Sequence, residues 1–262
     1  FAFVAFAINN GFKKISSIIL ILIALAGNIY IVYFLGFYGS PAIKSISDTE
    51  WQSFTKSVNI ENPLNSGEYK VASLYYGSGD DSRRAEFRDS ISLKTNSVDV
   101  NKFFNQSSGF TNWLRKNYWG FNSNNYPVNG RVWYPMESGN FPLVIIVHGN
   151  HNMEDYSDPG YEYLGRHLAS KGFIAVSVDE NFLNGTWYGD YQQNENFTRG
   201  YLLLEHIRNW TKWNNDSTNL FYKKIDLNNI ALIGHSRGGQ AVAIAAAINN
   251  LPNYYIDGKI KF

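Results

Sequence analysis

The distribution of hydrophobic residues first marks out the N-terminal part of the chain. Residues 15–39 contain no charged side chain and are long enough to cross a bilayer as a helix. Another apolar segment, residues 1–8, precedes them, and a short loop with Lys13 and Lys14 separates the two. The run is too long for the core of a cleaved signal peptide. The pattern therefore predicts a transmembrane helix over 15–39, preceded by the tail of a second membrane segment.

The next segment, residues 40–66, is polar and mixed. It predicts a linker with a first helix that begins in SDTEW, residues 47–51, because Ser and Asp cap helices and Glu favours the first turn. The two lysines before the transmembrane helix place their loop in the cytoplasm by the positive-inside rule. Everything after the helix is then expected on the other side of the membrane, outside the cytoplasm.

Residues 67–129 alternate between apolar and polar side chains. The segments 69–79 and 89–100 carry valine, isoleucine and tyrosine at alternating positions, the pattern of half-buried antiparallel strands. The segment 110–121 is rich in aromatic residues, and its tryptophans indicate packing against a core rather than a sugar-binding platform. This part is expected to form the antiparallel N-terminal strands of a larger domain.

From residue 130 onward, strand patterns alternate with helix patterns. The apolar runs are nearly continuous, as expected for strands that are covered on both faces, and the segments between them have helical spacing. The predicted strands are 130–135, 142–149, 173–180 and 229–234, and the predicted helices are 161–172, 197–213 and 239–250. This order builds right-handed crossovers on a mainly parallel sheet that is flanked by helices, which is an α/β fold.

The last predicted strand leads directly into the motif Gly234-His235-Ser236-Arg237-Gly238, which has the form G-x-S-x-G. A serine nucleophile must stand clear at the end of the sheet, and this requires a sharp, strained turn between strand and helix. Small residues two positions away on each side let strand and helix pass closely. The turn also places the serine at a helix N-terminus, where unpaired N–H groups favour a developing negative charge.

Together with the earlier segment IIVHGNH, residues 145–151, this motif resembles the α/β-hydrolase superfamily. The chain is most similar to the esterase branch that contains cutinases, polyester hydrolases, chlorophyllases and platelet-activating-factor acetylhydrolases, over about residues 130–262. The resemblance implies that Ser236 is the nucleophile of the elbow formed with Gly234, His235 and Gly238. It also implies an oxyanion hole made by the backbone N–H groups of Arg237 and Asn150.

In the families that the chain resembles, the catalytic acid and then the histidine follow the serine, each after a later strand. Residues 258–262 resemble the start of the next strand. The acid and the histidine are therefore expected beyond residue 262, and 67–262 is interpreted as an incomplete hydrolase domain with its core at 130–262. By this reading, the membrane part comprises residues 1–39, and the chain is a fragment.

Residues nearer to the motif were also considered as a general base. His148 and His235 flank the predicted site, but a base must point at the serine hydroxyl, and a role in shaping the turns is favoured for both. His151 is the remaining alternative. His167 and His206 fall on predicted helices and are interpreted as structural.

Several residues on the loops at the carboxyl end of the sheet are candidates for a substrate cleft, because open α/β folds bind ligands there. Glu180 ends a strand at this edge and either faces the cleft or caps a loop. Tyr156, Trp187 and Tyr188 lie on two of the loops, and either wall the cleft or are ordinary loop aromatics. His151 is included in this candidate cleft.

Composition excludes several classes of function. The chain has 23 basic and 22 acidic residues, and this balance gives no electrostatic case for nucleic-acid binding. It has no cysteine, which excludes a disulfide framework, a thiolate zinc site and a cysteine nucleophile. No short-spaced histidine motif indicates a metal site, and no cofactor is expected. The sequence predicts a membrane-anchored serine hydrolase for small-molecule or lipid-like carboxylic esters; the alternative is a membrane-tethered binding module of the same fold without catalysis.

Overall fold

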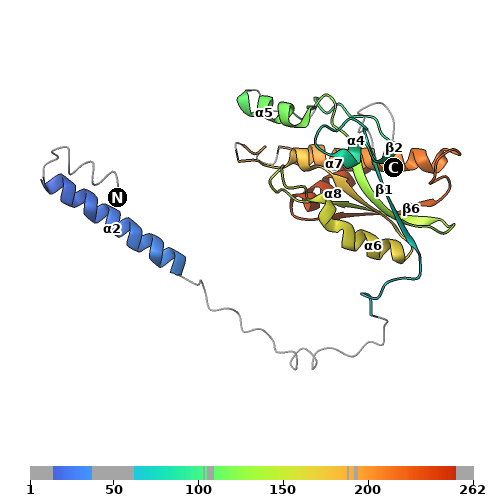
Figure 1. Ribbon diagram of the computed structural model, residues 1–262, viewed down its shortest axis with the longest axis horizontal. Helices are drawn as coiled ribbons and strands as arrows, with labels where there is room; N and C mark the ends of the chain where they lie inside the picture. Colours follow the sequence, from blue (N-terminus) through green and yellow to red (C-terminus); the bar gives the residue numbers. More distant parts are fainter. Residues whose placement is uncertain are drawn as a thin grey trace. The chain divides into compact units, whose positions relative to one another are not determined.

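The computed structural model describes residues 14–36, 62–102, 104, 109–187, 189–191 and 194–251 (Figure 1). The chain divides into two compact units, Phe1–Glu61 and Asn62–Phe262, and each is described by itself. Three predictions fall outside the described residues: the apolar tail at 1–8, the helix start at 47–51 and the strand start at 258–262. Tyr188 also lies outside them.

In the first unit, helix α2 (Lys14–Gly36) covers most of the predicted transmembrane segment. Within the described part of the chain, however, no helix is both long and apolar enough to cross a membrane. The prediction was based on the length of the segment 15–39 and its lack of charge, whereas α2 also contains the polar Asn28, whose side-chain amide donates to the carbonyl of Ala24 at 2.7 Å. The prediction of a transmembrane helix is therefore wrong for α2. The membrane localisation stays a prediction.

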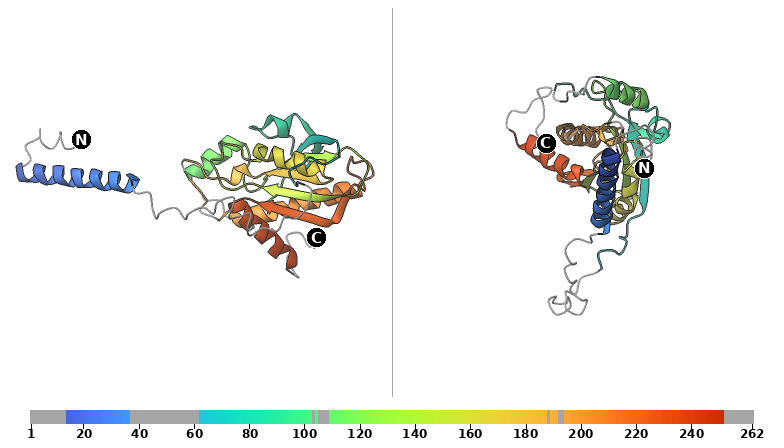
Figure 2. Two further views of the ribbon diagram at one scale, coloured as in Figure 1. Left: turned by 90° about the horizontal axis from the view of Figure 1, so that it is seen from below. Right: turned by 90° about the vertical axis from the view of Figure 1, so that its left-hand side faces the viewer.

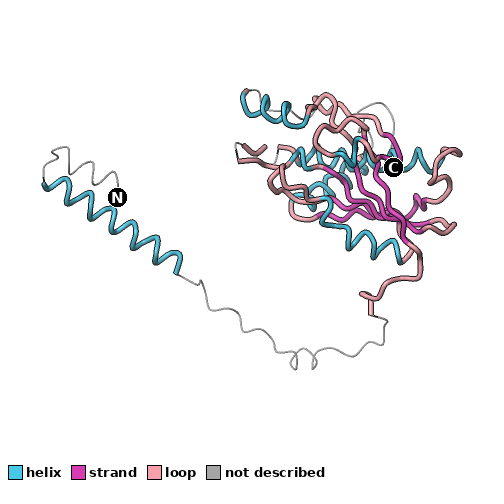
Figure 3. Tube along the Cα trace, viewed as in Figure 1, coloured by secondary structure: helices cyan, strands magenta, loops and turns pink. Residues whose placement is uncertain are grey.

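The second unit is built on a mixed sheet of six strands in the order β2-β1-β3-β5-β4-β6, with helices on both faces (Figures 2 and 3). Strands β5 and β6 both pair with β4 in parallel, and β3 pairs with both β1 and β5 in an antiparallel sense. The strands are β1 (Val71–Gly77), β2 (Ile91–Lys94), β3 (Asn129–Pro135), β4 (Phe141–Val147), β5 (Ile174–Asp179) and β6 (Ile225–Gly234). The predicted α/β class and all four strands of the core are confirmed.

Two strand predictions need correction. Strand β1 is antiparallel to β3 as expected, but β2 runs parallel to β1. The reason is that the short helix α4 (Ala85–Arg88) lies between β1 and β2, so the chain crosses over instead of reversing in a hairpin. Strand β6 was predicted to be buried on both faces, yet in the described sheet it has a neighbour on one side only, and Ile233 is 39% exposed.

The helices cover the two faces of the sheet. In β3, Val132 packs in the core cluster with residues of α7, whereas the neighbouring Trp133 lies against Gly165 of α6, where a Cβ atom would collide with the indole ring. The two side chains point to opposite faces because successive residues of a strand do so. The helices are α5 (Phe110–Trp119), α6 (Glu162–Ser170), α7 (Asn196–Asn215) and α8 (Arg237–Asn250), with 3₁₀ turns η1 (Asp158–Tyr161) and η2 (Asn181–Leu183).

Strands β4 and β6 are neighbours in the sheet and end at the same edge. Leu143, Ile145 and Val147 of β4 are fully buried, as the continuous apolar run predicts. Val147 is in register with Gly234, the last residue of β6. The two segments that follow, one from His148 and one from His235, therefore leave the sheet side by side.

Candidate functional site

Ser236 occupies a strained turn between β6 and α8. It is the N-cap residue of α8 and has φ 52° and ψ −120°. Among the described residues other than glycine, only Lys223 also has a positive φ. This region of backbone space is unfavourable for any residue with a Cβ atom and persists only where the surroundings enforce it. Ser236 is also exposed. The turn therefore presents the hydroxyl at the carboxyl edge of the sheet, as the sequence motif predicts.

Three glycines make this turn possible. A Cβ atom on Gly234 would collide with the carbonyl group of Gly238, and one on Gly238 would collide with the carbonyl oxygen of Val147. A Cβ atom on Gly149 would lie 2.7 Å from the Cβ of Ser236. The sequence motif indicated the first two glycines, but not that Gly149 determines how closely the two turns approach. Its position two residues after the end of the buried strand β4 is the signal that points to this contact.

Hydrogen bonds of the turn leave two donors available. The N–H groups of Gly238 and Gly239 donate to the carbonyls of His235 and Ser236 at 2.8 and 2.9 Å, and the N–H of His235 donates to Val147 at 3.1 Å. Among the described residues, no hydrogen bond uses the N–H of Arg237 or that of Asn150. These are the two groups that the resemblance to α/β-hydrolases implies for an oxyanion hole.

His148 holds the turn after β4 in place. It is buried, its Nδ1 donates to the carbonyl of Gly149 at 2.8 Å, and its Nε2 accepts from the N–H of Glu180 at 3.1 Å. Burial lowers the pKa of His148 to about 4, so the ring is neutral near pH 7. Both ring nitrogens are used by the backbone, and this agrees with the structural role favoured from sequence.

The other histidines divide between surface and core. His235 and His151 are exposed, and the nearest carboxylate to His151 is that of Asp155, 3.8 Å from Nδ1. His206 is buried in α7, where its Nδ1 lies 2.6 Å from the hydroxyl of Tyr76, and burial lowers its pKa to about 3. His206 is thus a core residue, as predicted.

Of the two readings of Glu180, the structure supports neither a side chain that faces an open cleft nor one that caps the following turn, since Glu180 is the N-cap residue of η2 but makes no side-chain cap hydrogen bond. Its side chain is fully buried, and Oε2 lies 3.3 Å from Nη1 of Arg199 in α7, which is also fully buried. Arg199 in turn donates to Oδ1 of Asn184 at 2.7 Å. The strand end directs this carboxyl group under the loops rather than into solvent. Burial outweighs the attraction of Arg199 and raises the pKa of Glu180 to about 8.

The raised pKa of Glu180 predicts a fall in stability with rising pH. In the folded protein Glu180 holds its proton up to about pH 8, whereas in the unfolded chain it ionises near 4.5, so the unfolded state binds fewer protons in between. Above the ordinary pKa of histidine, 6.5, the buried histidines no longer oppose this trend. From pH 6.5 to 8 the free energy of unfolding should fall by up to about 1.4 kcal/mol per pH unit.

Urea unfolding followed by circular dichroism measures this slope. In Glu180→Gln the titrating group is absent, and the slope over the same pH range should be lost. An equal slope in both proteins would show that another group causes it.

The predicted cleft aromatics have different environments. Tyr156 is half-buried, its ring lies 4.0 Å from the guanidinium carbon of Arg84, and its hydroxyl is 3.3 Å from that of Tyr118. It therefore packs on a charged cluster, and a cleft role for it is not supported. Trp187 is 84% exposed at the tip of a tight turn. The structure does not gather these side chains with Glu180 and His151 into one wall.

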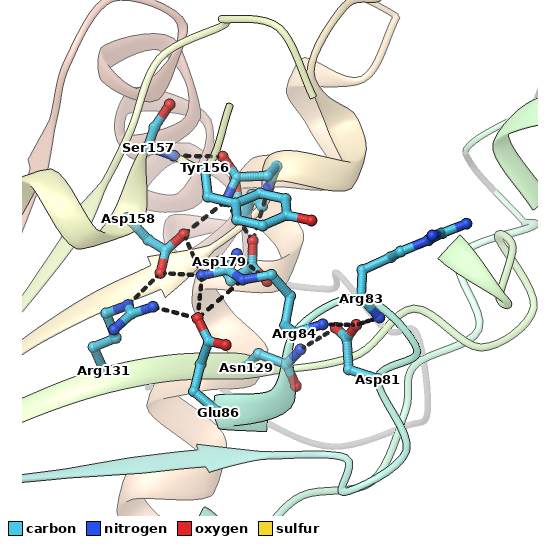
Figure 4. A network of polar contacts seen from close by, with 12 residues as sticks. Asp81, Arg83, Arg84, Glu86, Asn129, Arg131, Tyr156, Ser157, Asp158 and Asp179 are labelled. Carbon is cyan, nitrogen blue, oxygen red and sulfur yellow. Dashed lines mark hydrogen bonds and ion pairs between the residues drawn. The ribbon is translucent and has the colours of Figure 1, made fainter. Parts of the chain in front are cut away.

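A buried cluster of charges, which sequence reasoning missed, lies under these loops (Figure 4). The guanidinium of Arg84 is fully buried and contacts the carboxylates of Asp158 at 2.8 Å and Asp179 at 3.1 Å. Arg131 binds Asp158 at 2.6 Å and also pairs with Glu86. The cluster joins β3, β5, η1 and α4, and so fixes the ends of strands at this edge.

The side chain of Arg237 has a role that the sequence did not indicate. Its two terminal nitrogens bind the two carboxylate oxygens of Asp190 at 3.0 and 2.9 Å, and Nη1 also binds the buried Glu195 at 2.5 Å. The sequence assigned only the backbone of Arg237 to the site. Within the ranges described, no group of three or more potential ligands is arranged to hold a metal ion.

One family model matches this chain. It is described as Chlorophyllase, and it covers residues 112–257, slightly more than half of the chain. The matched segment runs from α5 to α8 and contains both turns at the carboxyl edge, with Asn150 and Ser236. No curated protein matches the chain.

Proposed function

Since this chain belongs to the chlorophyllase family and has the α/β-hydrolase kind of fold, we propose that it is a serine hydrolase that cleaves carboxylic esters with Ser236 as nucleophile. The observation that carries the proposal is the strained, exposed backbone of Ser236 at the N-terminus of α8. Strain of this kind is retained where function requires it. The proposal covers small-molecule and lipid-like esters.

In the proposed reaction, Oγ of Ser236 bonds to the ester carbonyl carbon, and the carbonyl electrons move onto its oxygen. The N–H groups of Arg237 and Asn150 then stabilise this oxyanion. When the tetrahedral intermediate collapses, the bond to the alcohol oxygen breaks, and the alcohol leaves with a proton. Water attacks the acyl-serine in the same way and releases the carboxylic acid. The proton of the Ser236 hydroxyl passes to a general base, proposed to be a histidine as in the families that the chain resembles, and this base then gives the proton to the leaving alcohol.

A fluorophosphonate probe tests the nucleophile, because it phosphonylates activated serines. The full-length protein should be labelled, and Ser236→Ala should lose all labelling. Ser90 is an exposed serine in ordinary surroundings, so Ser90→Ala is the matched control and should be labelled like the wild type. Equal labelling of the Ser236→Ala variant would refute the proposal. A complete lack of labelling in the wild type would favour the binding module without catalysis.

A further inference from the structure

A short segment after η2 contacts both turns of the candidate site. We define the strap as residues 185–187 and 189–190. The N–H of Thr186 donates to the carbonyl of Gly189 at 2.8 Å, and the N–H of Gly189 donates back to Thr186 at 3.1 Å. The two legs of the strap are therefore held side by side, and a Cβ atom on Gly185 would lie 3.5 Å from Cγ of Asp190.

The strap is also fixed from below. The buried side chain of Arg115, from α5, donates to the carbonyls of Asn184 at 2.9 Å and Gly189 at 3.1 Å. One guanidinium nitrogen thus holds the residue directly before the first leg and Gly189 of the second leg. Because Arg115 is 2% exposed, the strap rests on a rigid, buried support.

The first leg binds the turn after β4. The N–H of Gly185 donates to Oδ1 of Asn150 at 2.7 Å, and the carbonyl of Gly185 accepts from the N–H of Met153 at 2.8 Å. Gly185 is buried. The side chain of Asn150 is therefore held on the strap, while its backbone N–H donates to no other residue that the structure describes.

The second leg binds the first residue of α8. Asp190 receives the paired bonds from Arg237 described above, and this geometry restricts the guanidinium more than a single contact would. The side chain of Arg237 is 19% exposed, and its other partner, Glu195, is fully buried. The second leg is therefore attached to α8, the helix that begins directly after Ser236.

We propose that the strap sets the separation between the two oxyanion donors and that Asp190 is a positioning residue for ester hydrolysis. This inference rests on the proposed function. The oxyanion role uses only backbone N–H groups, yet the side chains of both donor residues, Asn150 and Arg237, bind the same short segment. Donors stabilise an oxyanion only when they lie about 2.7–3.1 Å from it. A misplacement of about 1 Å can lower the rate by about 10²-fold.

Three variants of the full-length protein test the strap: Asp190→Ala, Asn150→Ala and the double variant. The substrate is p-nitrophenyl acetate, and the inhibitor is a trifluoromethyl ketone, whose adduct with Ser236 carries an oxyanion. Each single variant should lower kcat by about 10- to 100-fold and weaken inhibition by a similar factor. KM should change little. Because either change breaks the connection that the strap makes between Asn150 and Arg237, the double variant should be no slower than about the slower single variant.

The control is Glu162→Gln, which removes an exposed ion pair with Arg166 in α6 and should leave kcat unchanged. Asp190→Asn keeps the size of the side chain and replaces Asp190→Ala if unfolding midpoints show that the alanine variant is unstable. If the wild type is active and the Asp190 variants keep its kcat, the positioning role of the strap is refuted but the proposed function is not. The same holds if the fold-losses in kcat of the two single variants multiply in the double variant. A wild type that neither hydrolyses the ester nor reacts with a fluorophosphonate overturns the proposed function and the strap with it.

Discussion

Replacing Ser236 with glycine is expected to abolish ester hydrolysis and, at the same time, to make the protein more stable. Removal of a serine nucleophile lowers kcat by at least about 10⁴-fold. The serine has φ 52° and ψ −120°, a conformation that costs a residue with a Cβ atom about 1–3 kcal/mol. Glycine adopts it without strain, although glycine gains about 0.5–1 kcal/mol of stability in the unfolded chain.

The net gain in the free energy of unfolding should be about 1 kcal/mol, or about 2–4 °C in Tm for a domain of this size. Ser236→Ala is the matched control, because alanine keeps the Cβ atom and with it the strain. Both variants should be inactive against p-nitrophenyl acetate, but calorimetry should show the higher Tm for the glycine variant only. A glycine variant that melts at or below the alanine variant would mean that the turn is not strained.

Arg84→Met is expected to cause the largest loss of stability of any single change considered. The substitution leaves the buried carboxylates of Asp158 and Asp179 without their shared cation, and breaking a buried ion pair in this way costs about 3–5 kcal/mol. Burial already raises the pKa of Asp179 to about 6. Without Arg84 this carboxyl group should take up a proton more readily, so the loss should be smaller at pH 5 than at pH 8.

Urea unfolding at the two pH values measures this loss. Arg88→Gln is the control, since Arg88 and Asp89 form an exposed pair at 2.8 Å, and exposed pairs contribute little. Its unfolding midpoint should equal that of the wild type. A loss below about 1 kcal/mol in Arg84→Met would show that the carboxylates find other partners.

The site was predictable where it depends on local sequence. The elbow needs small residues at fixed spacing around one serine, and Gly234 and Gly238 show that spacing directly. The alternation of strands and helices after residue 130 likewise follows from hydrophobic periodicity. The strained backbone of Ser236 follows from this local pattern, because strand, turn and helix are consecutive in the chain.

Features that depend on distant partners were missed or predicted wrongly. Arg84 and Asp158 are 74 residues apart, and arginine is seldom fully buried, so nothing near Arg84 in the sequence indicates its position. Glu180 ends a strand at the expected edge, but whether such a side chain points into solvent depends on Arg199, which belongs to a later helix. The direction of β2 depends on the short helix α4, whose four residues carry too little pattern to predict.

The contact between Gly149 and Ser236 has a consequence for motion. An added Cβ atom on Gly149 would have no room beside Ser236 and His235, so the turn after β4 lies close against the turn after β6, and neither has space to shift without displacing the other. Thermal fluctuations should then carry the hydroxyl of Ser236 and the amide of Asn150 together. The relative position of these two groups is thus maintained because the close packing leaves no space for alternative arrangements of the two turns.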